Sequence, residues 1–328
     1  MNGAHTTAKT KALNARAPHG GTAGASDGLL NLWWEKRRAG LVRYDPHLLV
    51  LHAVEEACAD HGWGTVFYSK AREDYKTRVG NLPEKRSATF DLELMARLQL
   101  ASAGGLNVAA NPNSIVPGHL VIWPQEKGAE LTFEDLRDMS RLARAHESLT
   151  FIHNMEQAAA SIIDWAHFQA YPWEFPLSRE ACEPIHESAG CKLSRLPETY
   201  PAYVLVVESE REETLATWLF GMLGALAKGN ESNAFARVPC NIVWRGAKAW
   251  LIPRSLGQSA LAAAYVGALE MGGLFCLPNA DSLRQYLPDA LRSEVRRASV
   301  ADEPAMRGWC ERIARELAAN LRPAGETT

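Results

Sequence analysis

The sequence predicts an α+β fold in which antiparallel sheets are flanked by helices and two units of similar size follow one another. Short β-forming runs alternate with amphipathic stretches along the chain, and the same alternation starts again after Pro172. The chain has 328 residues, of which 47% are hydrophobic and 22% charged. This is enough to bury one or two substantial cores.

The first unit combines strands with one well-marked helix. Strands are expected at residues 106–110, 119–123 and 150–154. Thr132 opens a helix with Asp135 in the capping-box position, and Leu131 and Leu136 can form the hydrophobic staple. A further helix is expected over residues 47–61, where apolar residues form a stripe.

The second unit repeats the pattern after a connection over residues 172–200 that contains prolines and cysteines. The expected elements are strands at 203–207, 241–244, 250–253 and 274–277, helices at 212–228 and 258–269, and further helices to about residue 321. The predicted organisation is a disordered tail (1–28), an N-terminal half (29–178), a C-terminal half (179–322) and a short tail (323–328).

Composition excludes several classes of protein. A net charge of −3 and a pI near 6.4 argue against a general nucleic-acid binder. No apolar run approaches the roughly 20 residues that a membrane span needs, and the first residues lack the apolar stretch of a signal peptide. A cytoplasmic location is therefore expected.

The cysteines are scattered and form no C-x-x-C pair. Cys182, His186 and Cys191 are the one local group that resembles metal ligands, but their spacing does not match a common zinc site. We predict no metal and no cofactor.

The stretch Asp164-Trp165-Ala166-His167-Phe168-Gln169-Ala170-Tyr171 is the most informative part of the chain. If it is extended, residues 165, 167, 169 and 171 share one face. An imidazole and a carboxamide two residues apart then lie roughly 6–7 Å apart along the strand. That spacing suits attack by the imidazole on phosphorus while the amide holds a phosphoryl oxygen.

The run His-Phe-Gln-Ala-Tyr resembles the active strand of the His-triad superfamily. The resemblance is to the branch of galactose-1-phosphate uridylyltransferase, diadenosine tetraphosphate phosphorylase and, most closely, plant-type GDP-L-galactose phosphorylase. Other segments between residues 65 and 290 are similar in order. They are residues 79–86, 111–113, 117–124, 241–244, 250–254 and 268–273.

The resemblance implies a His-triad-like fold with two tandem halves. It makes His167 the nucleophile that becomes nucleotidylated, with Nδ1–H held by a backbone carbonyl and Nε2 free to attack, and it matches Gln169 to the family's phosphoryl-binding glutamine. Trp165 stands where the family has its first histidine. We expect the Trp165 indole to pack against the strand rather than to stack on a ligand.

Further residues are predicted to bind the substrate. They are Asn81, Lys85, Arg86, Asn154, Ser161, Trp165, Lys228 and Asn233. Ser161 closes a turn, Ala158-Ala159-Ala160-Ser161, that lacks the glycines usual in the uridylyltransferases. His119 is expected only to complete a Pro-Gly-His turn.

The predicted function is nucleotidyl transfer of the phosphorylase type. A nucleoside diphosphate sugar, such as a GDP-hexose, or a related nucleotide ester would donate the nucleotide to His167, and phosphate or a phosphorylated acceptor would then take it. The alternatives are cleavage of a dinucleoside polyphosphate of the Ap4A type and a catalytically altered protein that only binds nucleotide. A homodimer is compatible with the sequence, and neither a nucleic acid nor a membrane is expected as a partner.

Overall fold

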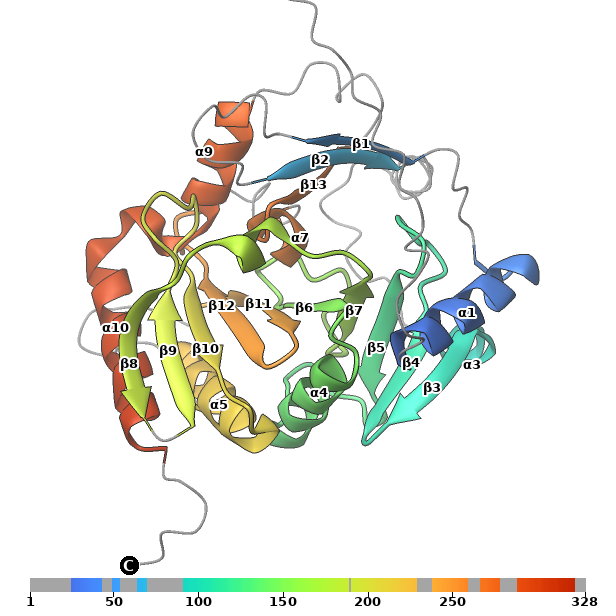
Figure 1. Cartoon of the computed structure of the whole chain (residues 1–328), viewed down its shortest axis with the longest axis horizontal. Helices are drawn as coiled ribbons and strands as arrows, with labels where there is room; N and C mark the ends of the chain where they lie inside the picture. Colours follow the sequence, from blue (N-terminus) through green and yellow to red (C-terminus); the bar gives the residue numbers. More distant parts are fainter. Residues whose placement is uncertain are drawn as a thin grey trace, which may run out of the picture.

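Ten strands form the main sheet, in the order β3-β4-β5-β7-β6-β11-β12-β10-β9-β8 (Figure 1). The computed structural model describes residues 25–42, 49–53, 64–69, 91–188, 190–228, 238–258, 266–277 and 288–321. The strands of the main sheet are β3 (Gln99–Ala103), β4 (Leu106–Ala110), β5 (Leu120–Pro124), β6 (Thr150–Asn154), β7 (Phe168–Tyr171), β8 (Glu183–Ser188), β9 (Cys191–Arg195), β10 (Leu205–Glu208), β11 (Cys240–Arg245) and β12 (Lys248–Pro253). All neighbouring pairs in this sheet are antiparallel.

The strand order repeats between the two ends of the sheet. In the N-terminal half, β3, β4 and β5 are followed by helix α4 (Phe133–Ala145), and β7 then lies between β5 and β6. In the C-terminal half, β8, β9 and β10 are followed by helix α5 (Glu212–Lys228), and β12 lies between β10 and β11. The halves meet where β6 pairs with β11. The fold is therefore α+β with two tandem halves, as predicted, although the boundary at residue 178 stays a prediction.

One face of the sheet is covered by α4, α5 and α10 (Pro304–Ala319). Their apolar residues share a core with alternate residues of the strands, including Phe168 and Ala170 of β7. Helix α4 begins as the sequence predicts, since Thr132 and Asp135 form a complete capping box.

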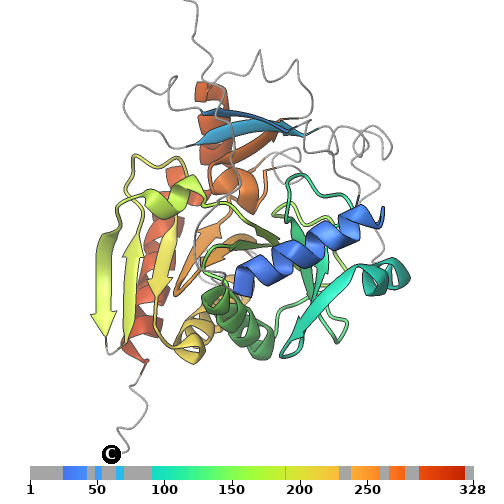
Figure 2. The same cartoon turned by 45° about the vertical axis from the view of Figure 1, so that its right-hand side comes forward.

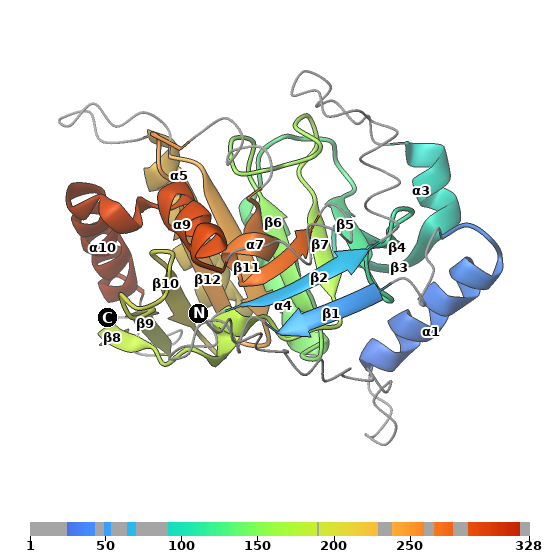
Figure 3. The same cartoon turned by 90° about the horizontal axis from the view of Figure 1, so that it is seen from above.

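The other face is covered by α7 (Ala268–Met271), α9 (Pro288–Ala298) and a second, three-stranded sheet (Figure 3). In this second sheet β2 (Thr65–Ser69) lies between β1 (Leu49–Ala53) and β13 (Leu274–Leu277). Strand β13 pairs in parallel with β2, so segments of both halves contribute to it.

Helix α1 (Ala25–Arg38) lies against β3 at the N-terminal edge of the main sheet (Figure 2). Its Trp33 is fully buried and donates its indole N–H to Ser114. The helix begins within the residues expected to form a tail. The remaining helical segments are α3 (Leu92–Leu98), η3 (Pro176–Arg179) and η5 (Val300–Asp302).

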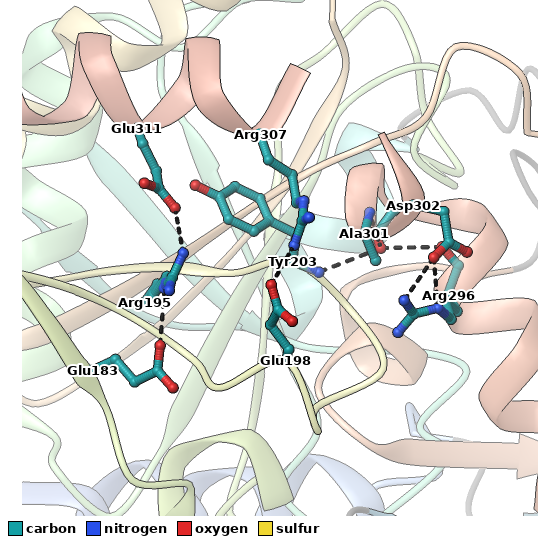
Figure 4. A network of polar contacts seen from close by, with 10 residues as sticks. Glu183, Arg195, Glu198, Tyr203, Arg296, Ala301, Asp302, Arg307 and Glu311 are labelled. Carbon is teal, nitrogen blue, oxygen red and sulfur yellow. Dashed lines mark hydrogen bonds and ion pairs between the residues drawn. The ribbon is translucent and has the colours of Figure 1, made fainter. Parts of the chain in front are cut away.

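Ion pairs tie α10 to the C-terminal half (Figure 4). Arg195 of β9 donates to Glu183 at 3.0 Å and to Glu311 of α10 at 2.8 Å. Arg307 of α10 donates to Glu198 at 3.0 Å. All are partly exposed, so each contributes little to stability, and they fix the position of a helix that apolar packing already holds.

Most expected elements are present within a residue or two, but two helices are wrong. The helix expected over 258–269 is contradicted at residues 258 and 266–267, which are not helical, and α7 begins only at Ala268; residues 259–265 lie outside the described residues. The helix expected over 47–61 is contradicted at residues 49–53, which form strand β1; residues 54–61 lie outside the described residues. A short apolar run has no periodicity that separates helix from strand, and pairing with β2 decides the outcome. The connection over 172–200 also contains strands β8 and β9, which were not predicted from the sequence. In the described part of the chain, no helix combines the length and the apolar character that crossing a membrane requires.

Candidate active site

His167 lies directly before β7, on a backbone that turns into the sheet. Its side chain is buried. Nδ1–H donates to the carbonyl oxygen of Trp165 at 3.2 Å, and Nε2 lies 3.4 Å from the hydroxyl of Ser161. This is the tautomer that a nucleophilic imidazole needs, because the proton sits on Nδ1 and the lone pair of Nε2 faces the turn.

Burial also keeps His167 neutral. It lowers the pKa of the imidazole below the usual 6.5, and the hydrogen bond to Trp165 opposes this shift only in part. A neutral imidazole at pH 7 can act as a nucleophile, whereas an imidazolium cannot.

The backbone around His167 is held from two sides. His153 of β6 is buried and donates Nδ1–H to the carbonyl of His167 at 2.9 Å. Burial lowers the pKa of His153 to about 4, so it too is neutral. On the other side, the Trp165 indole donates to the carbonyl of Pro124 at 3.2 Å and the amide of Ala166 donates to Gly128 at 2.6 Å.

Trp165 occupies a different position from the one that simple alternation predicts. Strand β7 begins only at Phe168, so the shared face expected for residues 165 to 171 does not extend back to Trp165. Its indole lies in the core on the side of Phe168. The indole therefore packs in the core, and the Trp165 backbone carbonyl accepts from His167.

Gln169 is oriented by two neighbouring side chains. Its carboxamide oxygen accepts from the Tyr171 hydroxyl at 2.6 Å and from His119 Nε2 at 2.9 Å. His119 stacks on Tyr171, and its Nδ1 accepts from the amide of Ile115, which places its proton on Nε2. Asn111 Nδ2 lies 3.2 Å from the same Nε2, but a protonated nitrogen cannot accept from it. With its oxygen occupied, Gln169 has its NH₂ group available for a ligand.

The predicted phosphate turn forms without glycine. Ala159 adopts the left-handed conformation, with φ of 70°. The amides of Ala158 and Ala160 donate back to Met155. Within the described residues no acceptor is found for the amides of Ala159 and Ser161. A turn with one left-handed residue and free amides is a common anion-binding arrangement.

A buried polar network lies behind this turn. Asn241 of β11 donates to Asn154 at 2.7 Å and to the Ala158 carbonyl at 2.8 Å. Arg254, which is fully buried, donates to Asn241 and to Gln258. Gln258 in turn donates to the Gln157 carbonyl at 2.9 Å.

The other predicted binding residues fall into two groups. Asn154 uses its oxygen to accept from Asn241 and from the amide of Ala268 at 2.8 Å, so only its NH₂ group could meet a ligand. Lys228 ends α5 and is exposed, and in the described part of the chain no hydrogen bond links it to His167. Asn81, Lys85, Arg86 and Asn233 lie outside the described residues.

The predicted lack of a metal remains to be tested. Cys182 is exposed, while Cys191 is buried and its thiol has a pKa raised to about 11 by burial. Across the described ranges, no three His, Cys, Asp or Glu side chains lie close enough to hold a metal ion.

His119, His153, Asn241, Arg254 and Gln258 were not predicted as site residues. Their signal in the sequence is weak. His119 follows Pro-Gly, His153, Asn241 and Arg254 lie in or directly after strands, and Gln258 lies in the polar segment after β12. The pairing of β6 with β11 and with β7 brings His153 and Asn241 to the site.

Comparison with known proteins shows a fold shared with solved structures of low sequence identity. Residues 96–172 match a domain of unknown function (DUF4922), well under half of the chain. No curated protein sequence matches. The crystal structure of yeast Ap4A phosphorylase Apa2 is similar over 84% of this chain and 95% of its own, with a TM-score of 0.57 and 12% identity. Its complex with Ap4A is similar over 84% and 98%, with a TM-score of 0.57 and 10% identity.

A third structure, an ADP-glucose phosphorylase from Arabidopsis thaliana with bound ADP-glucose, matches more loosely. It covers 79% of this chain and 98% of its own at 13% identity, and its TM-score is 0.34. Structural neighbours at these identities establish the fold, and the predicted His-triad-like fold is confirmed. They do not by themselves assign a substrate.

Proposed function

We propose that this protein is a nucleotidyltransferase of the phosphorylase type that works through a nucleotidyl-histidine on His167. The observation that carries the proposal is the state of His167, which is buried and neutral, with Nδ1–H on a backbone carbonyl and Nε2 beside the turn. His153 is also buried and neutral with Nδ1–H on a backbone carbonyl, so the position of Nε2 beside the turn is what distinguishes His167.

The reaction would proceed in two displacements. Nε2 of His167 forms a bond to the α-phosphorus of a nucleotide ester, and the bond from phosphorus to the leaving phosphate oxygen breaks with its electron pair. The imidazole then carries a positive charge, which the Trp165 carbonyl stabilises through Nδ1–H. Phosphate next attacks the same phosphorus and returns the imidazole to its neutral state.

Two parts of the site would stabilise the charge on the phosphoryl oxygens. The NH₂ group of Gln169 is available because its oxygen is held by His119 and Tyr171. The amides of Ala159 and Ser161 and the Ser161 hydroxyl supply further donors on the turn. Fixed donors of this kind typically contribute 10²–10³-fold each to the rate.

The donor is either a nucleoside diphosphate sugar, such as a GDP-hexose, or a dinucleoside polyphosphate. The first follows from the similarity of His-Phe-Gln-Ala-Tyr to GDP-hexose phosphorylases. The second is supported by the match to yeast Ap4A phosphorylase, which extends over most of both chains. Both donors place an α-phosphorus on the same histidine, so the proposed mechanism is common to them.

Intact-protein mass spectrometry would test the proposal. The protein is incubated without acceptor with GDP-, UDP- and ADP-hexoses and with Ap4A. We expect a covalent nucleotide on the wild type, removed by added phosphate and absent from His167→Gln. The mass of the adduct identifies the base. Binding of nucleotide without an adduct from any donor would reject the transferase and favour a nucleotide-binding protein.

A further inference from the structure

The buried network behind the turn has one centre, Arg254. Its guanidinium hydrogen-bonds to the side-chain oxygens of Asn241 and Gln258 and to the backbone carbonyls of Val266 and Ala298. Burial lowers the pKa of Arg254 to about 9, while the charge of Glu270 opposes this shift. The guanidinium is therefore still a cation at pH 7 and donates only.

This bonding pattern fixes the orientation of two carboxamides. Because Arg254 occupies the oxygen of each amide, each must point its NH₂ group away from Arg254. Asn241 then donates to the Ala158 carbonyl at 2.8 Å and Gln258 donates to the Gln157 carbonyl at 2.9 Å. Arg254 thus holds two consecutive carbonyls of the turn through two intermediate side chains. We call these two paths, through Asn241 to Ala158 and through Gln258 to Gln157, the relays.

Holding these carbonyls determines where the turn's amides point. In a trans peptide the N–H lies opposite the carbonyl. With the Ala158 carbonyl held against Asn241, the Ala159 amide must point away from the network. Ala159 also carries the left-handed φ of 70°, which is unfavourable for an alanine and requires support from its surroundings.

We propose that Arg254 is a positioning residue that holds the turn at residues 157–161 in its phosphate-binding shape, through Asn241 and Gln258. The inference rests on the proposed function of that turn. It assigns a role in the N-terminal active site to residues of the C-terminal half. Arg254 itself touches no reacting atom.

Gln258→Glu is the sharpest test because it keeps the bond from Arg254 and removes the bond to the Gln157 carbonyl. A carboxylate still accepts from Arg254, so the buried cation keeps its partner. It cannot donate, and it places an oxygen against the Gln157 carbonyl. Gln99→Glu is the matched control, since Gln99 also donates to a backbone carbonyl but lies on β3 at the far edge of the sheet.

We expect three results for Gln258→Glu. Amide hydrogen exchange over residues 156–161 becomes about 10-fold faster, since one relay bond is lost. Adduct formation on His167 slows by about 10–100-fold, as expected for a misplaced binding group. Affinity for the nucleoside monophosphate that binds the wild type best, among GMP, UMP and AMP, falls about 10-fold. Gln99→Glu should change none of these.

A rescue distinguishes positioning from general damage. Glycine accepts φ of 70° without strain. Ala159→Gly in the Gln258→Glu background should therefore recover part of the lost rate and affinity. Arg254→Gln removes both relays and should lose more of the rate and affinity. If Arg254→Gln fails to fold, the result for Gln258→Glu decides the test.

The outcomes of the proposed function and of this inference are separable. If the wild type binds a nucleoside monophosphate but forms no adduct, the transferase proposal is rejected. If Gln258→Glu then loses this nucleotide binding and its turn amides exchange faster, the role of Arg254 as a positioning residue is still supported. Unchanged exchange and unchanged nucleotide affinity in Gln258→Glu would overturn it.

Discussion

Replacing Trp165 by phenylalanine tests how the nucleophile is held. The change removes one indole N–H, which donates to the Pro124 carbonyl at 3.2 Å, and leaves a ring of similar character in the core. An unsatisfied buried acceptor costs about 1–3 kcal/mol, and the smaller ring adds a packing loss. We expect a total of about 2–3 kcal/mol, or a fall in Tm of several degrees.

The same change should alter the chemistry of His167. The Trp165 carbonyl accepts Nδ1–H at 3.2 Å, and this bond raises the pKa of His167 against the larger effect of burial. If the indole no longer anchors the segment, that bond weakens and the pKa falls further. Since only neutral His167 attacks, the acid limb of the rate of adduct formation should move to lower pH, and the rate at pH 7 should fall about 10-fold.

Trp218→Phe is the matched control. Trp218 is also fully buried and donates its indole N–H to a backbone carbonyl, that of Ala314, at 3.2 Å. It lies on α5, in the C-terminal half of the same core. The two variants should lose similar stability in urea, while only Trp165→Phe shifts the pH profile. An unshifted acid limb in Trp165→Phe, with stability reduced as in the control, would refute the anchoring role.

The remaining predictions concern the reaction, the acceptor, pH and metal. Gln169→Ala should slow adduct formation about 10²–10³-fold while nucleotide still binds; an unchanged rate in rapid-quench measurements would exclude Gln169 as a phosphoryl donor. Changing both Lys85 and Arg86 to alanine should weaken the use of phosphate more than adduct formation, and equal losses would assign this segment to the donor nucleotide instead. Because folding lowers the pKa of His153 from 6.5 to about 4 and lowers that of His167, the folded state resists protonation, and stability should fall as pH drops from about 6.5 towards 4. Urea titrations should show a loss of roughly 3 kcal/mol from His153 alone across that range, and a flat profile would contradict the burial argument. Elemental analysis of protein purified without added metal should find no stoichiometric zinc, and one zinc per chain would overturn this expectation.

Local signals in the sequence were sufficient for most elements of the fold. The capping box at Thr132 fixed the start of α4, and α5 has the bounds that were predicted from its apolar pattern. Strand β1 was missed because residues 48–51 are apolar without a period, and β8 and β9 because polar residues on these strands near the edge of the sheet hide the alternation.

The active site was predictable only where chemistry and spacing coincide. His167 and Gln169 are two residues apart, His167 directly before β7 and Gln169 on it, and their types suggest phosphoryl chemistry. His119 was assigned to a turn because nothing local shows that its ring meets Gln169, 50 residues away. Arg254 is further still from the turn in sequence, and a lone arginine after a strand is usually a surface residue. Such contacts depend on strand pairing across the whole sheet, which single residues do not encode.

The two halves repeat the strand order but differ at the position of the proposed nucleophile. In the second half β12 holds the place of β7, and Trp250 pairs with Val243 as Gln169 pairs with Ile152. The β11–β12 connection is a tight turn at Gly246, with φ of 58°, and lacks the long turn that precedes His167. Trp250 is buried beneath the apolar cover of that face. Within the described residues, the second half therefore has no counterpart of His167 or of the turn at residues 157–161, and it contributes support to that turn. Asn241 donates across the β6–β11 junction to the Ala158 carbonyl, and Arg254 holds Asn241.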